Sequence, residues 1–169
     1  MIKAVLFLSV LCMSAIVGFA QKPADLSGKW TLEISKSDLG QQAAMIKSQT
    51  MTITQAGTSF KVSTQTERNA PPDGAGGGRP GGGMGGGGEQ SYTLDGKEIS
   101  TERQTPNGAI TTKTKAEQTG NKIVITSVFP SPNGDIKSTS TYELSADGKS
   151  LTVTRESPRG ATKSVYTKG

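Results

Sequence analysis

The stretch AITTKTKAEQTGNKIVITSVF, residues 109–129, contains the pattern that decides the fold. From Ile110 to Ala116, apolar residues and threonines at every second position alternate with polar side chains. Such alternation is typical of a β-strand with one face turned toward a core. Gly120-Asn121 then marks a turn, and the apolar triplet at 123–125 begins a second strand. So short a connection predicts that the two strands pair as an antiparallel hairpin.

The same pattern recurs along most of the chain. It predicts ten strands, around residues 30–34, 50–54, 60–63, 92–94, 97–105, 109–119, 123–129, 136–144, 151–155 and 161–168. Nearly all connections have hairpin length, including a tight turn predicted at Asp95-Gly96, so consecutive strands should pair with one another. Residues 39–47 contain good helix formers, and we expect either a short helix or a loop there.

Residues 1–20 have the organisation of a signal peptide. Lys3 precedes an apolar run at 4–17, and Gly18-Phe19-Ala20 fits a small-x-small cleavage site. The run is too short for a comfortable membrane span. We therefore expect cleavage between Ala20 and Gln21, which leaves a mature chain without a stable membrane span. That chain, residues 21–169, has the length of one domain and is expected in the periplasm or outside the cell.

The composition of the mature chain excludes several kinds of chemistry. The sequence has no histidine, and its one cysteine, Cys12, leaves with the signal peptide. Imidazole and thiolate catalysis and the usual zinc sites are therefore impossible. The serines and carboxylates form no recognised catalytic pattern. We expect that the protein is not an enzyme and that it has no catalytic residues, no metal site and no cofactor.

The charge pattern gives little reason to expect a macromolecular partner. Eighteen Lys and Arg against fourteen Asp and Glu leave residues 21–169 with a formal charge of +4. The lysines are spread evenly and few aromatic residues are available for base stacking, so nucleic acid is not an expected partner. We expect a monomer.

Residues 70–89 differ from the rest of the chain in containing 11 glycines and three prolines. With almost no apolar side chain to bury, this segment is predicted to be a disordered loop between the third and fourth strands. Strings matching the dinucleotide-binding motif occur in it through composition alone. No strand–helix unit surrounds them, as that motif requires.

The supply of core residues favours a barrel. Residues 21–169 contain only 21 Leu, Ile, Val and Phe residues, which is few for two facing sheets with filled inner faces. We therefore predict an all-β, up-and-down antiparallel barrel of about ten strands, with a β-sandwich as the alternative. A barrel interior can hold water or a ligand. The residues predicted to line it are Trp30, Leu32, Met51, Ile53, Phe60, Val62, Tyr92, Ile110, Ile125 and Tyr142.

The segment DLSGKWTL, residues 25–32, resembles the first strand of the lipocalin and fatty-acid-binding-protein superfamily, where a G-x-W motif begins the barrel. The Thr-rich hairpins, ending in DGKSLTVTR at 147–155, look like those of lipocalin-like secreted bacterial proteins. The resemblance implies that Gly28 and Trp30 close one end of the barrel and that a late basic residue, here Arg155, packs on the Trp ring. The superfamily's fatty-acid binders also use an Arg-x-Tyr pair on the last strand. Lys163 and Tyr166 are three residues apart and should face opposite sides, which argues against such a site here.

Two functional hypotheses follow. The first is an exported barrel that binds a small apolar or amphipathic ligand in its lumen. The alternative is a non-enzymatic structural or interaction module of the cell envelope, with a filled barrel and no ligand. A cavity of ligand size inside the barrel would support the first hypothesis, and a filled interior would support the second.

Overall fold

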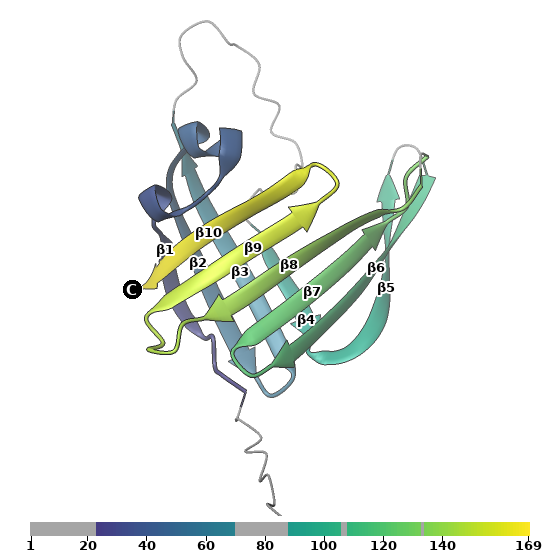
Figure 1. Cartoon of the computed structure of the whole chain (residues 1–169). Helices are drawn as coiled ribbons and strands as arrows, with labels where there is room; N and C mark the ends of the chain where they lie inside the picture. The colour runs from purple at the N-terminus through teal and green to yellow at the C-terminus, as the bar shows by residue number, and fades with distance from the viewer. Residues whose placement is uncertain (1–22, 70–87, 106–107, 133) are drawn as a thin grey trace, which may run out of the picture.

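The computed structural model describes residues 23–69, 88–105, 108–132 and 134–169 (Figure 1). The predicted signal peptide, and the Gly-rich segment as far as residue 87, lie outside the described residues. At its C-terminal end that segment was predicted one residue too long, because Glu89 is the first residue of a strand.

The described residues form ten strands and two short 3₁₀ helices. In chain order these are β1 (Gly28–Leu32), η1 (Ile34–Lys36), η2 (Gly40–Met45), β2 (Ile46–Ala56), β3 (Ser59–Arg68), β4 (Glu89–Thr93), β5 (Asp95–Thr105), β6 (Gly108–Thr119), β7 (Lys122–Phe129), β8 (Ile136–Leu144), β9 (Ser150–Ser157) and β10 (Gly160–Lys168). The ten predicted strands are confirmed, except that Ile34 belongs to η1 rather than to the first strand and Leu94 lies just beyond the end of β4. The short helix expected within residues 39–47 is present as the 3₁₀ helix η2, and the last two residues of that segment already belong to β2.

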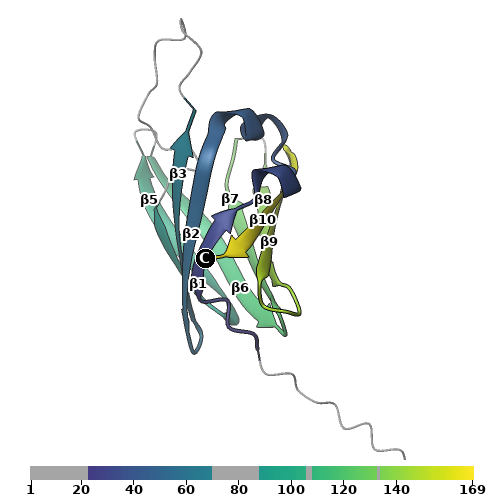
Figure 2. The same ribbon diagram turned by 90° about the vertical axis from the view of Figure 1, so that its left-hand side faces the viewer.

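All ten strands belong to one antiparallel sheet in the order β4-β3-β2-β1-β10-β9-β8-β7-β6-β5. The first and last strands pair through Trp30–Lys168 and Leu32–Tyr166, which rolls the sheet on itself. Figures 1 and 2 show the two resulting walls, with β7–β10 crossing in front of β1–β3 at a steep angle. The predicted barrel is confirmed, and the sandwich alternative is not adopted.

The predicted hairpin at Asp95-Gly96 is wrong. β4 and β5 are the two ends of the described sheet and form no ladder with each other. Leu94 donates its N–H to the carbonyl of Thr58, and Asp95 already pairs with Glu117 of β6, with a register irregularity before Glu98. The Asp-Gly pair therefore carries the chain from one edge of the sheet to the other. A local turn preference is outweighed here by the ladder that β5 forms with β6.

The apolar core fills one end of the barrel, at the bottom of Figure 1, where the chain enters. We call its inward-facing side chains the floor, and they are Trp30, Leu32, Met51, Ile53, Phe60, Val62, Ala116, Ile123, Ile125, Tyr142, Leu144, Leu151, Val153 and Tyr166. All of them are buried and pack as one cluster with Leu26. At roughly 25 cal/mol per Å² of buried apolar area, this cluster is the main source of stability.

The segment before β1 lies across this end and is held by side-chain amides. Gln55 donates to Gln118 over 2.7 Å, and Gln118 donates to the carbonyl of Ala24 over 2.6 Å. Leu26 N–H donates to Gln55, and the Trp30 indole N–H donates to the Leu26 carbonyl, both over 3.0 Å. The buried indole and the entering backbone thus satisfy each other, as buried polar groups must.

Candidate functional site

The inward face of the barrel changes character along its strands. Beyond the floor, toward the β9–β10 turn at the top of Figure 1, many of the inward positions carry hydroxyl or amide side chains. We call these the polar belt, and they are Gln49, Thr64, Thr66, Thr112, Thr114, Ser127, Ser138, Ser140, Thr162 and Ser164. All are half-buried, whereas the floor is fully buried. The floor is therefore packed with the protein's own side chains, and water reaches the belt.

Arg155 lies where the floor meets the belt. It follows the buried Val153 by two residues on β9, so it points to the same inward side. Its cross-strand neighbours are Ser140 on β8 and Thr162 on β10, both members of the belt. The Arg155 side chain is nevertheless exposed to solvent, which places an accessible cation inside the barrel.

Three tyrosines from three different strands surround this cation. Arg155 lies near all three hydroxyl groups and interacts electrostatically with Tyr142, Tyr92 and Tyr166. Phe60 packs edge-on against Tyr142, with ring centroids 5.5 Å apart, and lies 6.4 Å from the Tyr92 ring. The rolled sheet thus brings one arginine and four aromatic rings to one place.

The three phenol groups are neutral at physiological pH. Burial, reinforced by the neighbouring Tyr142, raises the pKa of Tyr92 to about 12, while Arg155 acts in the opposite direction. Burial likewise raises the pKa of Tyr142 and of Tyr166, and the positive charge of Arg155 again opposes it. Arg155 is consequently the charge of this cluster, and the phenols serve as hydrogen-bonding groups around it.

Two of the phenols already have partners in the polar belt or beside it. The Tyr166 hydroxyl donates to Gln49 Oε1 over 2.7 Å, and Gln49 in turn donates to Thr66 over 2.7 Å. The Tyr92 hydroxyl donates to Gln90 Oε1 over 2.8 Å. These bonds fix the rings and leave the Arg155 guanidinium, with its five N–H donors, as the group with spare donor capacity.

Charges are separated between the two faces of the wall. Carboxylates within the described strands all have outward register, namely Glu67, Glu89, Asp95, Glu98, Glu102, Glu117, Glu143 and Glu156. Arginines within the described strands, Arg68, Arg103 and Arg155, all have inward register. Each of the seven ion pairs among the described residues uses a lysine, for example Lys113–Glu98 at 3.6 Å and Lys122–Glu143 at 3.2 Å. The described strands therefore present a carboxylate-free inner face to whatever enters.

At the closed end of the barrel, the prediction that Arg155 packs on the Trp30 ring is wrong. The cation over the Trp30 ring is Lys168, with Nζ 5.3 Å from the ring centroid, whereas Arg155 interacts with the tyrosines. The reason is register, since Trp30 pairs directly with Lys168 on β10. Gly28 is required here because its φ is +143° and a Cβ would lie 3.0 Å from Lys168 Cε. Gly28 and Trp30 thus lie together at the closed end.

The predicted lumen residues divide into two groups. Eight of the ten are buried in the floor, and they are Trp30, Leu32, Met51, Ile53, Phe60, Val62, Ile125 and Tyr142. Tyr92 is half-buried beside Phe60, and Ile110 is 37% exposed near the far end of β6. Arg155 was predicted only as a partner for Trp30, so its place among the tyrosines was missed. Lys163 and Tyr166 do face opposite sides, with Tyr166 buried and Lys163 exposed.

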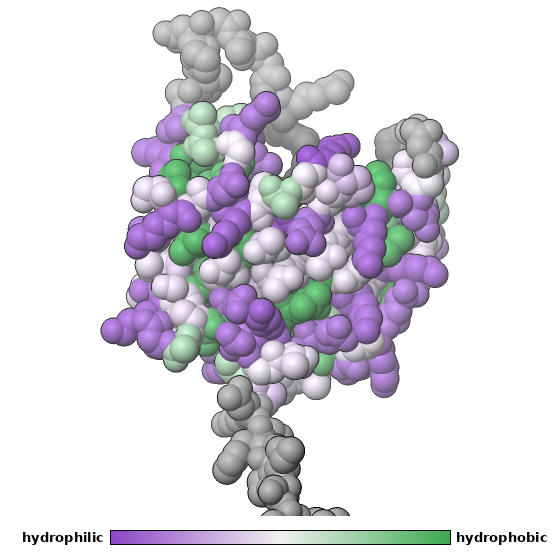
Figure 3. Space-filling view, viewed as in Figure 1, coloured by the Kyte–Doolittle hydropathy of each residue, from purple (hydrophilic) through white to green (hydrophobic). Residues whose placement is uncertain are grey.

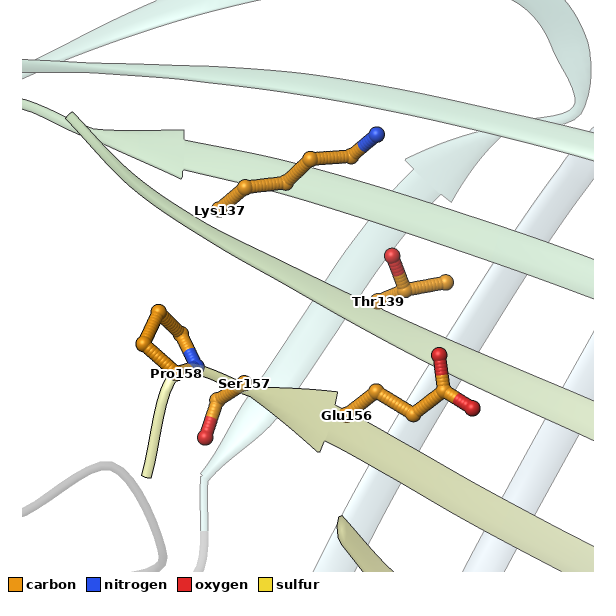
Figure 4. A pocket seen from close by; sticks show the side chains of 5 residues that line it. All are labelled: Lys137, Thr139, Glu156, Ser157 and Pro158. Carbon is orange, nitrogen blue, oxygen red and sulfur yellow. The ribbon is translucent and has the colours of Figure 1, made fainter. Parts of the chain in front are cut away.

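The outer wall offers two open depressions rather than a deep pocket. One, of about 330 Å³, is lined by Lys137, Thr139, Glu156, Ser157 and Pro158 on β8 and β9 (Figure 4). The other, of about 400 Å³, lies over β6 and β7 near Lys113 and Val128. Most of their lining residues have outward register, and Figure 3 shows the surrounding surface as hydrophilic with separate small hydrophobic patches. Neither depression lies in the lumen.

Among the described residues, no three His, Cys, Asp or Glu side chains come together in a way that could hold a metal ion. No helix in the described parts of the chain is long and apolar enough to cross a membrane.

Comparison with known proteins identifies the fold. No protein-family model matches the chain, and no curated protein sequence matches it. Three of the solved structures it resembles are the REP1-NXSQ fatty acid transporter (18% identity, TM-score 0.53), human cRBP IV (17%, 0.53) and apo lipid binding protein 8 of Caenorhabditis elegans (13%, 0.54). The matches cover 85%, 87% and 85% of this chain and 96%, 100% and 94% of those chains. The chain therefore has the fold of the lipocalin and fatty-acid-binding-protein barrels, as its G-x-W start suggested.

Proposed function

We propose that this protein is an exported, non-enzymatic barrel that binds a small amphipathic molecule with an anionic group. The observation that carries the proposal is Arg155, an accessible cation inside the barrel whose described surroundings contain three neutral phenols and no carboxylate. Support also comes from the fold, because structures with this architecture include a fatty acid transporter and a lipid binding protein.

The anionic group of the ligand is assigned to Arg155. A guanidinium binds carboxylate or phosphate through two parallel N–H···O bonds, and such charge-assisted bonds are about twice as strong as neutral ones. The neutral hydroxyl of Tyr142 lies near Arg155, so it can donate to the same anion. The polar belt supplies further hydroxyl groups at Ser140 and Thr162, next to Arg155 on the adjoining strands.

The apolar part of the ligand is assigned to surfaces outside the filled floor. Because Phe60 is fully buried in the floor, the ring accessible to a ligand at this height is the half-buried Tyr92. Beyond it, inward-facing threonines present both a methyl and a hydroxyl group. This favours an amphipathic ligand over a purely apolar one, since a hydrocarbon would leave the belt hydroxyls unpaired.

The test is a fluorescence titration with dansyl-undecanoic acid, an anionic amphiphile whose emission rises in an apolar site. We expect saturable binding by the wild type. Arg155→Gln should weaken it about tenfold to a hundredfold, which corresponds to the loss of a hydrogen bond to a charged group. The affinity of Arg155→Lys for the probe should lie between those of the wild type and of Arg155→Gln.

Arg159→Gln is the matched control, because it removes the same charge from the exposed β9–β10 turn. Arg159→Gln should bind the probe with the affinity of the wild type. The amide-capped, neutral form of the probe should bind the wild type as weakly as the acid binds Arg155→Gln. Equal affinity for the two probes, or no binding of either, would overturn the proposal.

Export is part of this proposal, and it is motivated by the sequence pattern of residues 1–20. N-terminal sequencing of the protein from its own host should find Gln21 as the first residue. A chain that still begins at Met1 would contradict it.

The alternative function, an interaction module with a filled barrel, is favoured by one observation, namely that the floor is packed with the protein's own side chains. Native mass spectrometry of protein purified from its host separates the two. A co-purified small molecule of discrete mass supports the binding protein, and a consistently empty barrel supports the module.

A further inference from the structure

The described chain leaves part of the inward face uncovered. Four large hydrophobic side chains are exposed among the described residues: Met45 at 51%, Ile99 at 47%, Ile110 at 37% and Ile136 at 38%. Three of these four lie on the inward face rather than on the outer wall. Ile99 is opposite Thr114 of the belt, and Ile136 is opposite Phe129. Apolar side chains that face inward are normally covered by the opposite wall of the barrel.

The reason for their exposure is the open sheet. β5 is a terminal strand, and within the described sheet it pairs only with β6. Figure 1 shows β5 and β6 curving away from the rest of the barrel at their upper ends. Ile99, Ile110 and Ile136 are accordingly left 47%, 37% and 38% exposed. We call the inward surface formed by Ile99, Arg103, Ile110, Phe129 and Ile136 the outer wing.

The outer wing also carries a cation. Arg103 is directly opposite Ile110 in the β5–β6 ladder, so the two side chains lie on the same inward face with Cβ atoms about 5 Å apart. No ion pair among the described residues involves Arg103, whereas the outward-facing Lys113 on the same two strands is paired with Glu98. A guanidinium beside exposed isoleucines matches an anionic head group attached to an apolar chain.

The outer wing is continuous with the site around Arg155. Ile136 and Ser140 are four residues apart on β8, which is about 13 Å along a strand, and Ser140 is the cross-strand neighbour of Arg155. The inward position between them, Ser138, carries a hydroxyl group. A ligand that moves along this face therefore meets cations and hydroxyl groups and no negative charge from the described strands.

We infer that the outer wing is a second binding station, which first captures the anionic amphiphile before it reaches Arg155. Arg103 takes the anionic group, and Ile110 and Ile136 take the apolar chain. This inference rests on the proposed function, because it uses the same ligand class. It adds a separate site with a separate role: Arg103 acts on the rate of association and Arg155 on the rate of dissociation.

The experiment is stopped-flow binding of dansyl-undecanoic acid to the wild type, Arg103→Gln, Arg155→Gln and Lys113→Gln. Lys113→Gln is the matched control, because it removes one positive charge from the outer face of the neighbouring strand. Arg103→Gln should lower the association rate constant about tenfold at low ionic strength, in the range of electrostatic steering. The loss should shrink as salt shortens the Debye length to about 8 Å. Arg155→Gln should chiefly raise the dissociation rate constant.

A second measurement locates the contact. In the full chain with Cys12→Ser, a single cysteine at Ile110→Cys or Thr111→Cys is labelled with an environment-sensitive fluorophore. Residues 110 and 111 are adjacent but face opposite sides of β6. Undecanoic acid should shift the emission of the label at position 110 and leave that at position 111 unchanged.

The outcomes are distinguishable. If the probe binds the wild type but Arg103→Gln behaves like Lys113→Gln, the outer station is overturned and the lumen site stands. If no variant and no wild-type protein binds the probe, the proposed function fails and the station fails with it. If light scattering shows a wild-type dimer that Ile110→Thr dissociates, the outer wing is an interface between copies and the inference is wrong.

Discussion

The floor and the polar belt are two halves of one inward face, built from the same strands but with opposite composition. On β8, Tyr142 and Leu144 are buried in the floor, whereas Ser138 and Ser140 of the same strand are half-buried in the belt. β9 shows the same change between Val153 and Arg155. The comparison indicates that the apolar end of the barrel holds the fold together, whereas the other end stays accessible to water.

The largest expected effect is in the floor. Phe60→Ala should lower the free energy of unfolding by about 3–5 kcal/mol, the usual loss for truncating a fully buried phenylalanine. Thr114→Ala in the belt, which loses a 3.3 Å hydroxyl contact with Ser127, should cost only about 0.5–1.5 kcal/mol. Urea unfolding measures both. Should Phe60→Ala fail to fold, Phe60→Leu keeps the comparison measurable, and equal losses at the two sites would contradict the division.

The next largest effect is at the closed end. Gly28→Ala should cost about 1–3 kcal/mol, because residue 28 has a φ of +143° and its new Cβ would meet Lys168. Gly40→Ala is the control, since its φ is +55° but no atom lies within 4 Å of the position that its methyl group would take. Only Gly28→Ala should change the fluorescence of Trp30, the single tryptophan, because Lys168 stacks on that ring. Identical spectra for both variants would remove the role assigned to Lys168.

A pH dependence follows from the buried phenols at the boundary between the two halves. The pKa of Tyr92 is about 12 in the folded protein against 10.0 for the free side chain, so the folded state holds the phenolic proton more tightly. This contribution to stability is complete below pH 10 and is lost as the pH rises through 12. Thermal unfolding at rising pH should therefore show a steeper alkaline loss in the wild type than in Tyr92→Phe. The same slope in both proteins would show that the Tyr92 phenol is not the source of the alkaline loss.

The smallest effect is expected on the outer wall. Lys122 and Glu143 form an ion pair at 3.2 Å, but both side chains are more than 40% exposed. Lys122→Gln should change the free energy of unfolding by no more than about 0.5 kcal/mol, because water and salt screen such pairs. A loss approaching that of Gly28→Ala would mean that the outer charges contribute to the fold as well as to solubility.

Most of the fold could be predicted from the residues alone, for a physical reason. Alternation and short turns are local properties, so the ten strands and their hairpin order were visible in the sequence. The shortage of apolar residues correctly favoured a barrel over two filled sheets. The single error of pairing, at Asp95-Gly96, occurred where a local turn signal competes with pairing to a more distant strand.

The candidate site was less visible, because it depends on which strands face one another when the sheet rolls up. Arg155 and Tyr166 are eleven residues apart on neighbouring strands, and Tyr92 reaches them only across the barrel. A search for an arginine and a tyrosine two residues apart on one strand therefore misses them. Register also decided that Lys168, and not Arg155, lies over Trp30. The inward direction of Arg103 became visible only through its pairing with Ile110.

Local alternation, turn residues and composition were thus sufficient for the strands and for the barrel, and the resemblance of the G-x-W start implied a tryptophan at the closed end. The division of the inward face, the cluster around Arg155 and the uncovered outer wing depend on long-range register and on where the sheet stays open. Those are set by the packing of the whole barrel, because side chains distant in sequence become neighbours only when β1 pairs with β10.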